Sequence, residues 1–326
     1  MKMVNTVLGQ VSPNDLGLTL MHEHVVSAMG SGYLIDETVA PFDRESCVTA
    51  ALETFGELKT YGVKTYVDAT PIDLGRDASL LREIAEKSGM NIVCSTGVYF
   101  EKNGAAAYYR FRSTIPFFDV VKEMEELLVK EITEGIGKTG VRAGVIKAAT
   151  GHGAISPYEQ NALKAAARAQ KATGVPIITH TEAGTMGPEQ ADLLIGEGAD
   201  PKQIMIGHAG GNGDMKYHTA ILDKGVYLSF DRIGIDLPPE MSDRWTLGCI
   251  IGLIGIGFTN RLMMSHDSIV RWLGRPLETM MSKVQPNWHP RRIFKDMIPV
   301  LKGAGVTDEK VKTILVDNPR RLFAGE

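Results

Sequence analysis

Short apolar runs alternate along the chain with longer amphipathic segments. Two typical runs are Val175-Pro-Ile-Ile-Thr179 and Ile204-Met-Ile-Gly207. Continuous apolarity predicts strands that are buried on both faces, because a half-buried strand would alternate apolar with polar residues. We therefore expect strands at residues 18–22, 64–69, 91–98, 143–148, 176–180, 203–208, 226–230 and 261–265.

Helical spacing of apolar residues is found between several of these strands. It occurs in segments 44–61, 78–87, 118–134 and 157–173. Ser156 stands at the N-cap position of the last segment, and Gly62, Gly174 and Gly225 stand where helices should end. Eight strands that alternate with helices predict an α/β protein with a parallel sheet, and we interpret it as a (β/α)8 TIM barrel.

An open, doubly wound sheet is the alternative topology. Such a fold usually has a glycine-rich phosphate-binding turn after its first strand. Here the first strand ends in Met21-His-Glu-His24 instead. No Pro/Ser-rich linker or charge block divides the chain, so residues 1–326 are predicted to form a single barrel domain.

Composition narrows the possible partners. The 326 residues include 35 Lys and Arg against 39 Asp and Glu, a net charge of −4, which argues against nucleic acid as a partner. No signal peptide and no membrane-spanning run is evident. Three cysteines, far apart, show neither metal spacing nor a disulfide framework. We therefore expect a soluble, cytoplasmic protein.

Metal-binding residue types recur at the ends of the predicted strands. These residues are His22, His24, Lys147, His180, His208 and Asp267. In a closed barrel the strand ends converge on one face, where catalytic residues gather. His22 and His24 should share a face of their strand while Glu23 points away. Imidazoles suit zinc, and also manganese, cobalt or iron; Asp267 adds an oxygen ligand that could accept a proton.

Single histidines carry less weight than this set. A lone buried histidine is more often a hydrogen-bonded core residue. We assign His152, His218, His266 and His289 to that class. His266 should alternate away from Asp267 along its strand.

Lys147 needs a separate explanation. A buried ammonium group would place a cation among cations. If the amine were neutral and had reacted with carbon dioxide, the carbamate could bridge two metal ions. Two alternatives remain open at this point: a lysine that extends to solvent, and a Schiff-base lysine of a lyase.

Several longer motifs make the chain similar to a known family. They are Leu20-Met-His-Glu-His24, Gly144-Val-Ile-Lys-Ala-Ala149, Ile177-Ile-Thr-His180, Ile206-Gly-His-Ala-Gly210, Phe230-Asp-Arg-Ile-Gly234 and Met264-Ser-His-Asp267. With them the chain resembles the phosphotriesterase family of the amidohydrolase superfamily, and in particular its lactonase-like branch. The resemblance runs from Thr6 to Phe323.

The resemblance implies a site with two divalent metal ions. His22, His24 and Asp267 would hold the more buried ion, and His180 and His208 the more exposed one. Lys147, as N6-carboxylysine, would bridge them together with a hydroxide that attacks an ester carbonyl or a phosphorus centre. Tyr99 and Arg232 match substrate-orienting residues of the lactonase branch, and Asp231 is a possible proton acceptor from Asp267. A homodimer is also implied.

The reaction implied is lactone hydrolysis, with phosphotriester hydrolysis as a side activity. Amide or carbamate hydrolysis at the same metals is an alternative, and a non-catalytic binding barrel is another. The sequence departs from the family in the turn after His208, which is less acidic, and in the loop at 268–288. That loop carries Arg271, Arg275 and Lys283, which suggests an anionic lactone or ester as substrate.

Overall fold

The central sheet of the computed structural model consists of parallel strands, and all except the last lie side by side in chain order. The model describes residues 2–31, 33–236, 242–275 and 277–326. Within this part the order is β10-β9-β8-β7-β6-β5-β4-β3-β11. The strands are β3 Leu18–Ser27, β4 Val63–Asp68, β5 Asn91–Gly97, β6 Val145–Thr150, β7 Ile177–Thr181, β8 Ile204–Ile206, β9 Tyr227–Phe230, β10 Leu262–Met264 and β11 Ile269–Trp272.

The sheet closes where its first strand meets the last segment. The Asp267 amide donates to the His22 carbonyl at 3.0 Å, and the His24 amide donates to the Ser268 carbonyl at 2.8 Å. Ser265 continues the pairing of β10 with β9 through a bond to the Phe230 carbonyl. These bonds join β3 to the segment between β10 and β11, so the fold is the predicted (β/α)8 barrel.

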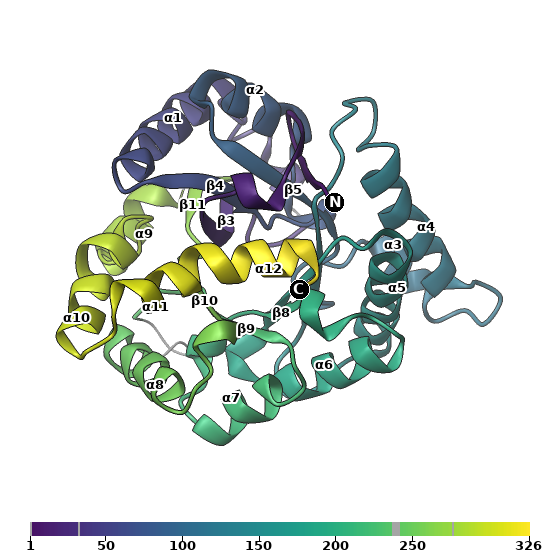
Figure 1. Ribbon diagram of the computed structural model, residues 1–326. Coiled ribbons are helices and arrows are strands. Elements are labelled where there is room, and N and C mark those ends of the chain that lie inside the picture. Colours follow the sequence, from purple (N-terminus) through teal and green to yellow (C-terminus); the bar gives the residue numbers. More distant parts are fainter. Residues whose placement is uncertain (1, 32, 237–241, 276) are drawn as a thin grey trace.

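Helices surround this barrel (Figure 1). They are α1 Arg44–Thr60, α2 Ala78–Ser88, α3 Ala107–Arg112, α4 Val120–Thr133, α5 Pro157–Thr173, α6 Gly187–Gly196, α7 Met215–Leu222, α8 Asp243–Gly255, α9 Glu278–Val284, α10 Ile298–Gly303, α11 Asp308–Lys312 and α12 Asn318–Ala324. Ser156 caps α5 in a capping box with Glu159, and Gly174 ends that helix in a left-handed conformation.

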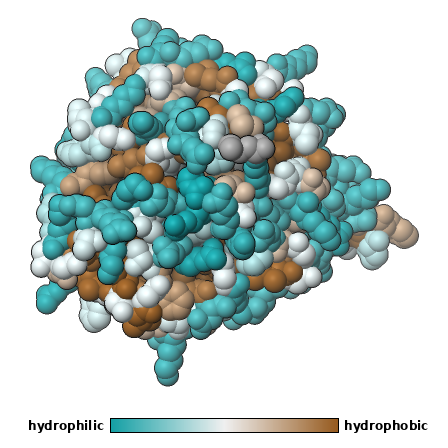
Figure 2. Space-filling model, in the orientation of Figure 1, coloured by the Kyte–Doolittle hydropathy of each residue, from teal (hydrophilic) through white to brown (hydrophobic). Residues whose placement is uncertain are grey.

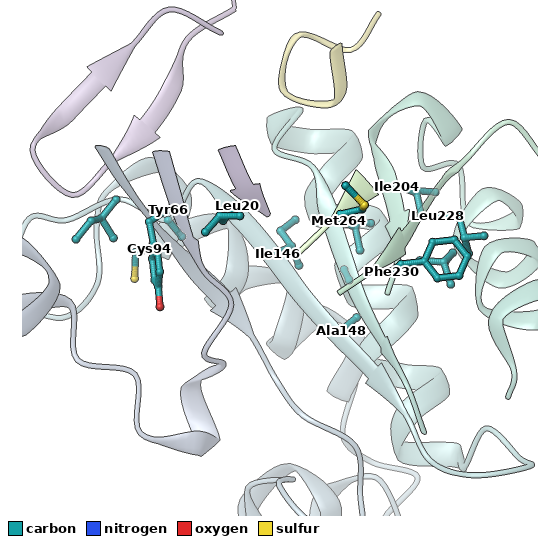
Figure 3. Packing of buried hydrophobic residues seen from close by; sticks show 14 of the residues in the cluster. Leu20, Tyr66, Cys94, Ile146, Ala148, Ile204, Leu228, Phe230 and Met264 are labelled. Atoms are coloured by element: carbon teal, nitrogen blue, oxygen red, sulfur yellow. The ribbon is translucent and has the colours of Figure 1, made fainter. Parts of the chain in front are cut away.

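Two separate apolar layers hold the structure together. The larger layer lies between the outer face of the strands and the helices. It contains residues such as Leu20, Tyr66, Ile146, Leu228 and Met264, which come from five different strands (Figure 3). Burial of this surface contributes about 25 cal/mol for each Å² removed from water.

The second layer fills the barrel interior near the amino ends of the strands. It includes Met21, Val145 and Tyr227, and it is closed by Leu322 and Phe323 of α12. In Figure 1, α12 lies across this end of the barrel, with both chain termini nearby. The outer surface seen from this side is mostly hydrophilic with scattered apolar residues (Figure 2). The interior is therefore sealed at one end, and polar chemistry is confined to the other.

Several expected boundaries were wrong. The first barrel strand continues to Ser27, five residues beyond the expected end, so His22 and His24 lie within it. The expectation also missed the hairpin β1 Val4–Thr6 with β2 Gly9–Val11, and the short β11. Cys47, Cys94 and Cys249 are free cysteines, and all three are buried. Within the described ranges, every helix is too short or too polar to cross a lipid bilayer.

The sealed end of the barrel should be a main source of stability. Phe323 is 2% exposed, and Phe323→Ala should lower the free energy of unfolding by about 3–5 kcal/mol, since it removes packed atoms and leaves a cavity. Phe117, which is 93% exposed, provides the matched control: Phe117→Ala should change stability by less than about 0.5 kcal/mol. Urea unfolding of wild type and both variants measures the free energy of unfolding. Equal losses in the two variants would contradict the packing role of Phe323.

Candidate metal centre

The two histidines of β3 face the barrel interior because the strand is irregular around His22. Leu20 belongs to the outer layer and Met21 to the inner one, so simple alternation would turn His22 outward. The pairing of β3 with β4 shifts register between Leu20 and Glu23. After this shift both His22 and His24 line the same cavity.

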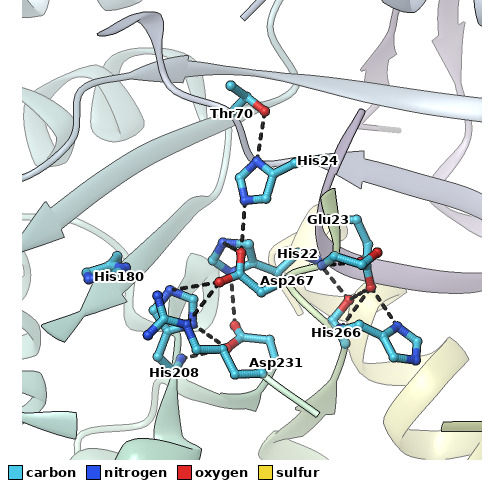
Figure 4. Close-up of polar contacts among 12 residues, drawn as sticks. His22, Glu23, His24, Thr70, His180, His208, Asp231, His266 and Asp267 are labelled. Atoms are coloured by element: carbon cyan, nitrogen blue, oxygen red, sulfur yellow. Dashed lines mark hydrogen bonds and ion pairs between the residues drawn. The ribbon is translucent and has the colours of Figure 1, made fainter. Parts of the chain in front are cut away.

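Glu23 points to the opposite side of the strand, as expected. Its carboxylate accepts hydrogen bonds from the Ser265 hydroxyl and the Ser268 amide, and it contacts His266 Nδ1 at 2.8 Å. Figure 4 shows Glu23 and His266 together, away from the other histidines. His266 is thus a buried structural residue, and this bond network fixes the segment that carries Asp267.

Asp267 lies at the centre of the site (Figure 4). Its Oδ1 is 2.9 Å from His24 Nε2 and 3.4 Å from His22 Nε2, and its Oδ2 is 3.9 Å from His208 Nε2. His22, His208 and Asp267 offer ligand atoms that all lie within 4.8 Å of one another, a group that could hold a metal ion. Burial alone would raise the pKa of Asp267, but His208 and His22 hold it well below its usual value.

Two of these residues adopt a backbone conformation that is uncommon for residues other than glycine. Asp267 has φ 55° and His208 has φ 58°. His208 was expected at the end of its strand, but it lies two residues beyond the end of β8. Left-handed residues of this kind cost on the order of 1 kcal/mol or more, and they persist where the surroundings hold them. Here the conformation turns both side chains into the cavity.

The ring nitrogens that face away from the cavity are also bound. Asp231 contacts His22 Nδ1 at 2.9 Å and His208 Nδ1 at 2.7 Å, and it accepts the backbone amide of His208 at 2.7 Å. The Thr70 hydroxyl lies 2.8 Å from His24 Nδ1. Burial opposes ionisation of Asp231, but His22 keeps its pKa below the usual value. Outer partners of this kind orient metal-binding imidazoles.

Lys147 lies inside the barrel and not at the surface. Its side chain is 2% exposed, and its Nζ is 2.7 Å from His22 Nε2. Burial lowers the pKa of Lys147 to about 8. The strand β5 approaches so closely here that a Cβ on Gly97 would lie 1.9 Å from the Lys147 carbonyl oxygen, so only glycine fits. The interpretation of Lys147 as a solvent-facing lysine is wrong.

His180 is close to the cluster but makes different contacts. Its ring packs edge-to-face on His208, with 4.5 Å between the centroids. Its Nδ1 is 3.1 Å from the Tyr99 hydroxyl, and its Nε2 is 2.8 Å from Glu182 Oε2. Sequence reasoning missed Glu182, although an acidic residue two positions after a candidate ligand was a signal that could have found it.

Tyr99 and Arg232 line the same cavity. Arg232 Nε donates to Asp267 Oδ2 at 2.9 Å. The Tyr99 amide donates to both carboxylate oxygens of Asp73, at 3.0 and 3.1 Å, which fixes the position of Tyr99. Burial raises the pKa of the Tyr99 hydroxyl, so this group stays protonated and can donate a hydrogen bond. Asp73 is a second residue that sequence reasoning missed.

The cavity above the cluster has a volume of about 200 Å³ and a largely apolar rim. The apolar side chains that line it include Met29, Leu74, Ile235, Ile269, Trp272 and Trp288. Together with the polar groups below, the result is an open pocket at the carboxyl ends of the strands, the usual position of the active site in barrel enzymes.

The expectation that the cations of residues 268–288 bind an anionic substrate is not supported. Arg275 pairs with Asp36 at 3.1 Å, and Arg271 contacts the Ser46 hydroxyl and the Val270 carbonyl. Lys283 lies on the exposed side of α9. Among the described residues, those that line the cavity include none of these three; position 276 lies outside the described residues.

The fold and this cluster define the class of the protein: a barrel with a buried imidazole–carboxylate centre, a combination used for metal-assisted hydrolysis. The model of the phosphotriesterase family matches residues 2–323, and the chain belongs to that family. It is a hydrolytic enzyme, which decides against the lyase and the non-catalytic binding barrel considered from the sequence.

Individual relatives match over nearly the whole chain. A phosphotriesterase homology protein of Mycobacterium tuberculosis is 37% identical, covering 98% of this chain and 97% of its own. A phospho-furanose lactonase of Mycoplasmopsis agalactiae is 34% identical, covering 99% and 92%. The structure of an organophosphorus hydrolase from Deinococcus radiodurans is 46% identical, with a TM-score of 0.95, covering 99% and 97%.

Asp73 should make stability depend on pH. Burial raises its pKa from 3.8 to about 6, so the folded state disfavours the ionised carboxylate. The free energy of unfolding should therefore fall as pH rises from about 4 to about 6, by up to roughly 3 kcal/mol, and stay lower above that interval. Asp73→Asn should remove this step.

Denaturant unfolding at several pH values, compared between wild type and variant, measures the step. Asp15 is exposed, so Asp15→Asn is the control and should leave the profile unchanged. Parallel profiles for wild type and Asp73→Asn would contradict the raised pKa.

Proposed function

We propose that this chain is a lactonase that uses two divalent metal ions. The observation that carries the proposal is the meeting of Asp267 with the Nε2 atoms of His22, His24 and His208 at the base of a cavity. Four imidazoles with a carboxylate nearby form a donor set that suits zinc, and also manganese, cobalt or iron. The outer partners Asp231 and Thr70 hold the rings of His22, His208 and His24 in the required orientation.

We assign His22, His24 and Asp267 to the more buried ion, and His180 and His208 to the more exposed one. Lys147, carboxylated on Nζ, would connect them. Its burial and its position 2.7 Å from His22 Nε2 support this role, because an ammonium group there would repel bound cations. Carboxylation converts the cation into an anion with two oxygen ligands.

Ions bound at this site would supply Lewis acidity and lower the pKa of a coordinated water. The residues of the chain transfer the proton and orient the substrate. As water attacks the carbonyl carbon, its proton passes to the Asp267 carboxylate, which Arg232 Nε holds in place by donating to Oδ2. The ring C–O bond then breaks and the ring oxygen takes up this proton, so a hydroxy acid is formed. Tyr99 stays protonated and orients the lactone by a hydrogen bond.

The apolar rim supports a neutral lactone with an apolar substituent. Trp272, Trp288 and Met29 line the part of the cavity that such a substituent would occupy. The Arg and Lys side chains of the 268–288 loop are directed away from the cavity, so they would not bind the phosphate of a phosphorylated lactone.

Phosphotriester hydrolysis remains a proposed side activity at the same site. A homodimer remains a prediction.

A substrate series tests this assignment. Across γ-lactones with longer alkyl substituents, kcat/KM should rise by up to about fourfold for each methylene buried, which corresponds to about 0.8 kcal/mol. Amides and phosphotriesters should be cleaved more slowly than the best lactone. A preference for a phosphorylated sugar lactone over its plain counterpart would contradict the neutral substrate, and a faster amide would contradict the lactonase assignment.

Lys147→Ala should lower metal content from two ions per chain to one or none, and kcat/KM by at least about a hundredfold, because the bridge is lost. Elemental analysis and lactone hydrolysis measure the two effects. Lys64 is exposed on β4 and provides the control. Lys64→Ala should retain both the metal content and the kcat/KM of wild type. Normal metal content and activity in Lys147→Ala would rule out the bridge, and activity with chelator present would rule out the metal mechanism.

A further inference from the structure

The histidines of the site follow a common pattern with one unexplained member. In His22, His24 and His208, Nδ1 contacts an outer partner and Nε2 faces Asp267. His180 is reversed, since its Nε2 contacts Glu182 at 2.8 Å. Its Nδ1 faces the Tyr99 hydroxyl, which lines the cavity. Glu182 thus has the position relative to His180 that Asp231 and Thr70 have relative to the other rings.

This contact differs from an ordinary surface ion pair. The His180 side chain is 1% exposed, while that of Glu182 is 32% exposed, so the carboxylate reaches inward to a buried ring. An ionised carboxylate can only accept hydrogen bonds. The His180 Nε2 must therefore carry the hydrogen, and in the neutral ring the lone pair is left on Nδ1.

The backbone turn that carries Glu182 is fixed by local contacts. Ala183 has φ 51°, a left-handed conformation within the turn. The Thr185 hydroxyl donates to the Glu182 carbonyl at 2.8 Å, and the Asn212 side-chain amide donates to the Gly184 carbonyl at 3.0 Å. Because contacts on both sides hold the turn, the backbone of Glu182 has a fixed position next to His180.

Asn212 belongs to the segment after His208, and this segment packs closely against the loop that follows His180. A Cβ on Gly211 would lie 2.6 Å from the Gly184 backbone nitrogen, so a larger residue would push the loops apart. The loops that follow His180 and His208 therefore support each other, and Glu182 is part of this arrangement.

We propose that Glu182 is the positioning residue of His180. It fixes the tautomer with hydrogen on Nε2 and directs Nδ1 toward the more exposed metal position. The inference rests on the proposed function for the metal ion, but the tautomer itself is a property of the chain alone. Loss of the carboxylate should release the ring and weaken the second ion, while the first ion keeps its ligands.

The test uses the full chain with Glu182→Ala, Glu182→Gln and the control Glu189→Gln, whose residue is exposed in the first turn of α6. Histidine side-chain ¹⁵N spectra of metal-free protein report the His180 tautomer. Competition with a chelator gives the affinity for each zinc ion. Glu182→Ala should show mixed tautomers and bind the second ion about 10- to 100-fold more weakly.

Glu182→Gln keeps an acceptor oxygen, so it should retain the tautomer and lie between wild type and Glu182→Ala in affinity. Glu189→Gln should match wild type. An unchanged tautomer and an unchanged second affinity in Glu182→Ala would overturn the proposal while leaving the lactonase assignment intact. If wild type bound no zinc, the proposed function would fall, and the tautomer spectra would still decide whether Glu182 orients His180.

Discussion

The closure of the barrel and the assembly of the polar site depend on the same contact. The Asp267 amide bonds to the His22 carbonyl, while the Asp267 carboxylate lies between the His22, His24 and His208 rings. The first and last strands therefore meet through the residue that organises the chemistry. Its left-handed backbone is held by pairing with β3 and by the Glu23 network behind it.

A second set of residues orients the inner ones. Asp231 joins the Nδ1 atoms of His22 and His208, and so links two rings that come from opposite halves of the chain. Each contact is buried, where an unpaired polar group would cost about 1–3 kcal/mol. The rings are therefore held in place before any ion or substrate binds, which reduces the reorganisation needed for binding.

The cavity separates the chemistry from substrate selection. Its base is made of charged and imidazole groups at the carboxyl ends of the strands, while its rim is made largely of apolar side chains from loops and from β11. Two relatives with different names, a phospho-furanose lactonase and an organophosphorus hydrolase, are 34% and 46% identical to this chain. Residues of the rim can therefore change the substrate while the polar base keeps the reaction.

Much of the fold was predictable from the sequence, because strands buried on both faces must be continuously apolar, and the helix caps are local. The residue types at the strand ends likewise indicated a polar site on one face. Sequence alone could not show the register shift between Leu20 and Glu23, since regular alternation from Met21 would have turned the His22 ring outward.

The contacts of Asp73 and Thr70 could not be read from the sequence either, because each partner is distant along the chain: Asp73 binds the Tyr99 amide, and Thr70 contacts His24. Glu182 stands only two residues after His180, so a local pattern could have indicated it, but only the folded turn shows that its carboxylate meets the ring. The same holds for the Arg and Lys residues of the 268–288 loop. The sequence shows their charge, but it does not show where their side chains point. The sequence by itself determined which strands form and which chemical groups they carry. The tertiary structure alone decided which groups meet, because side-chain direction depends on strand register and loop packing across the whole barrel.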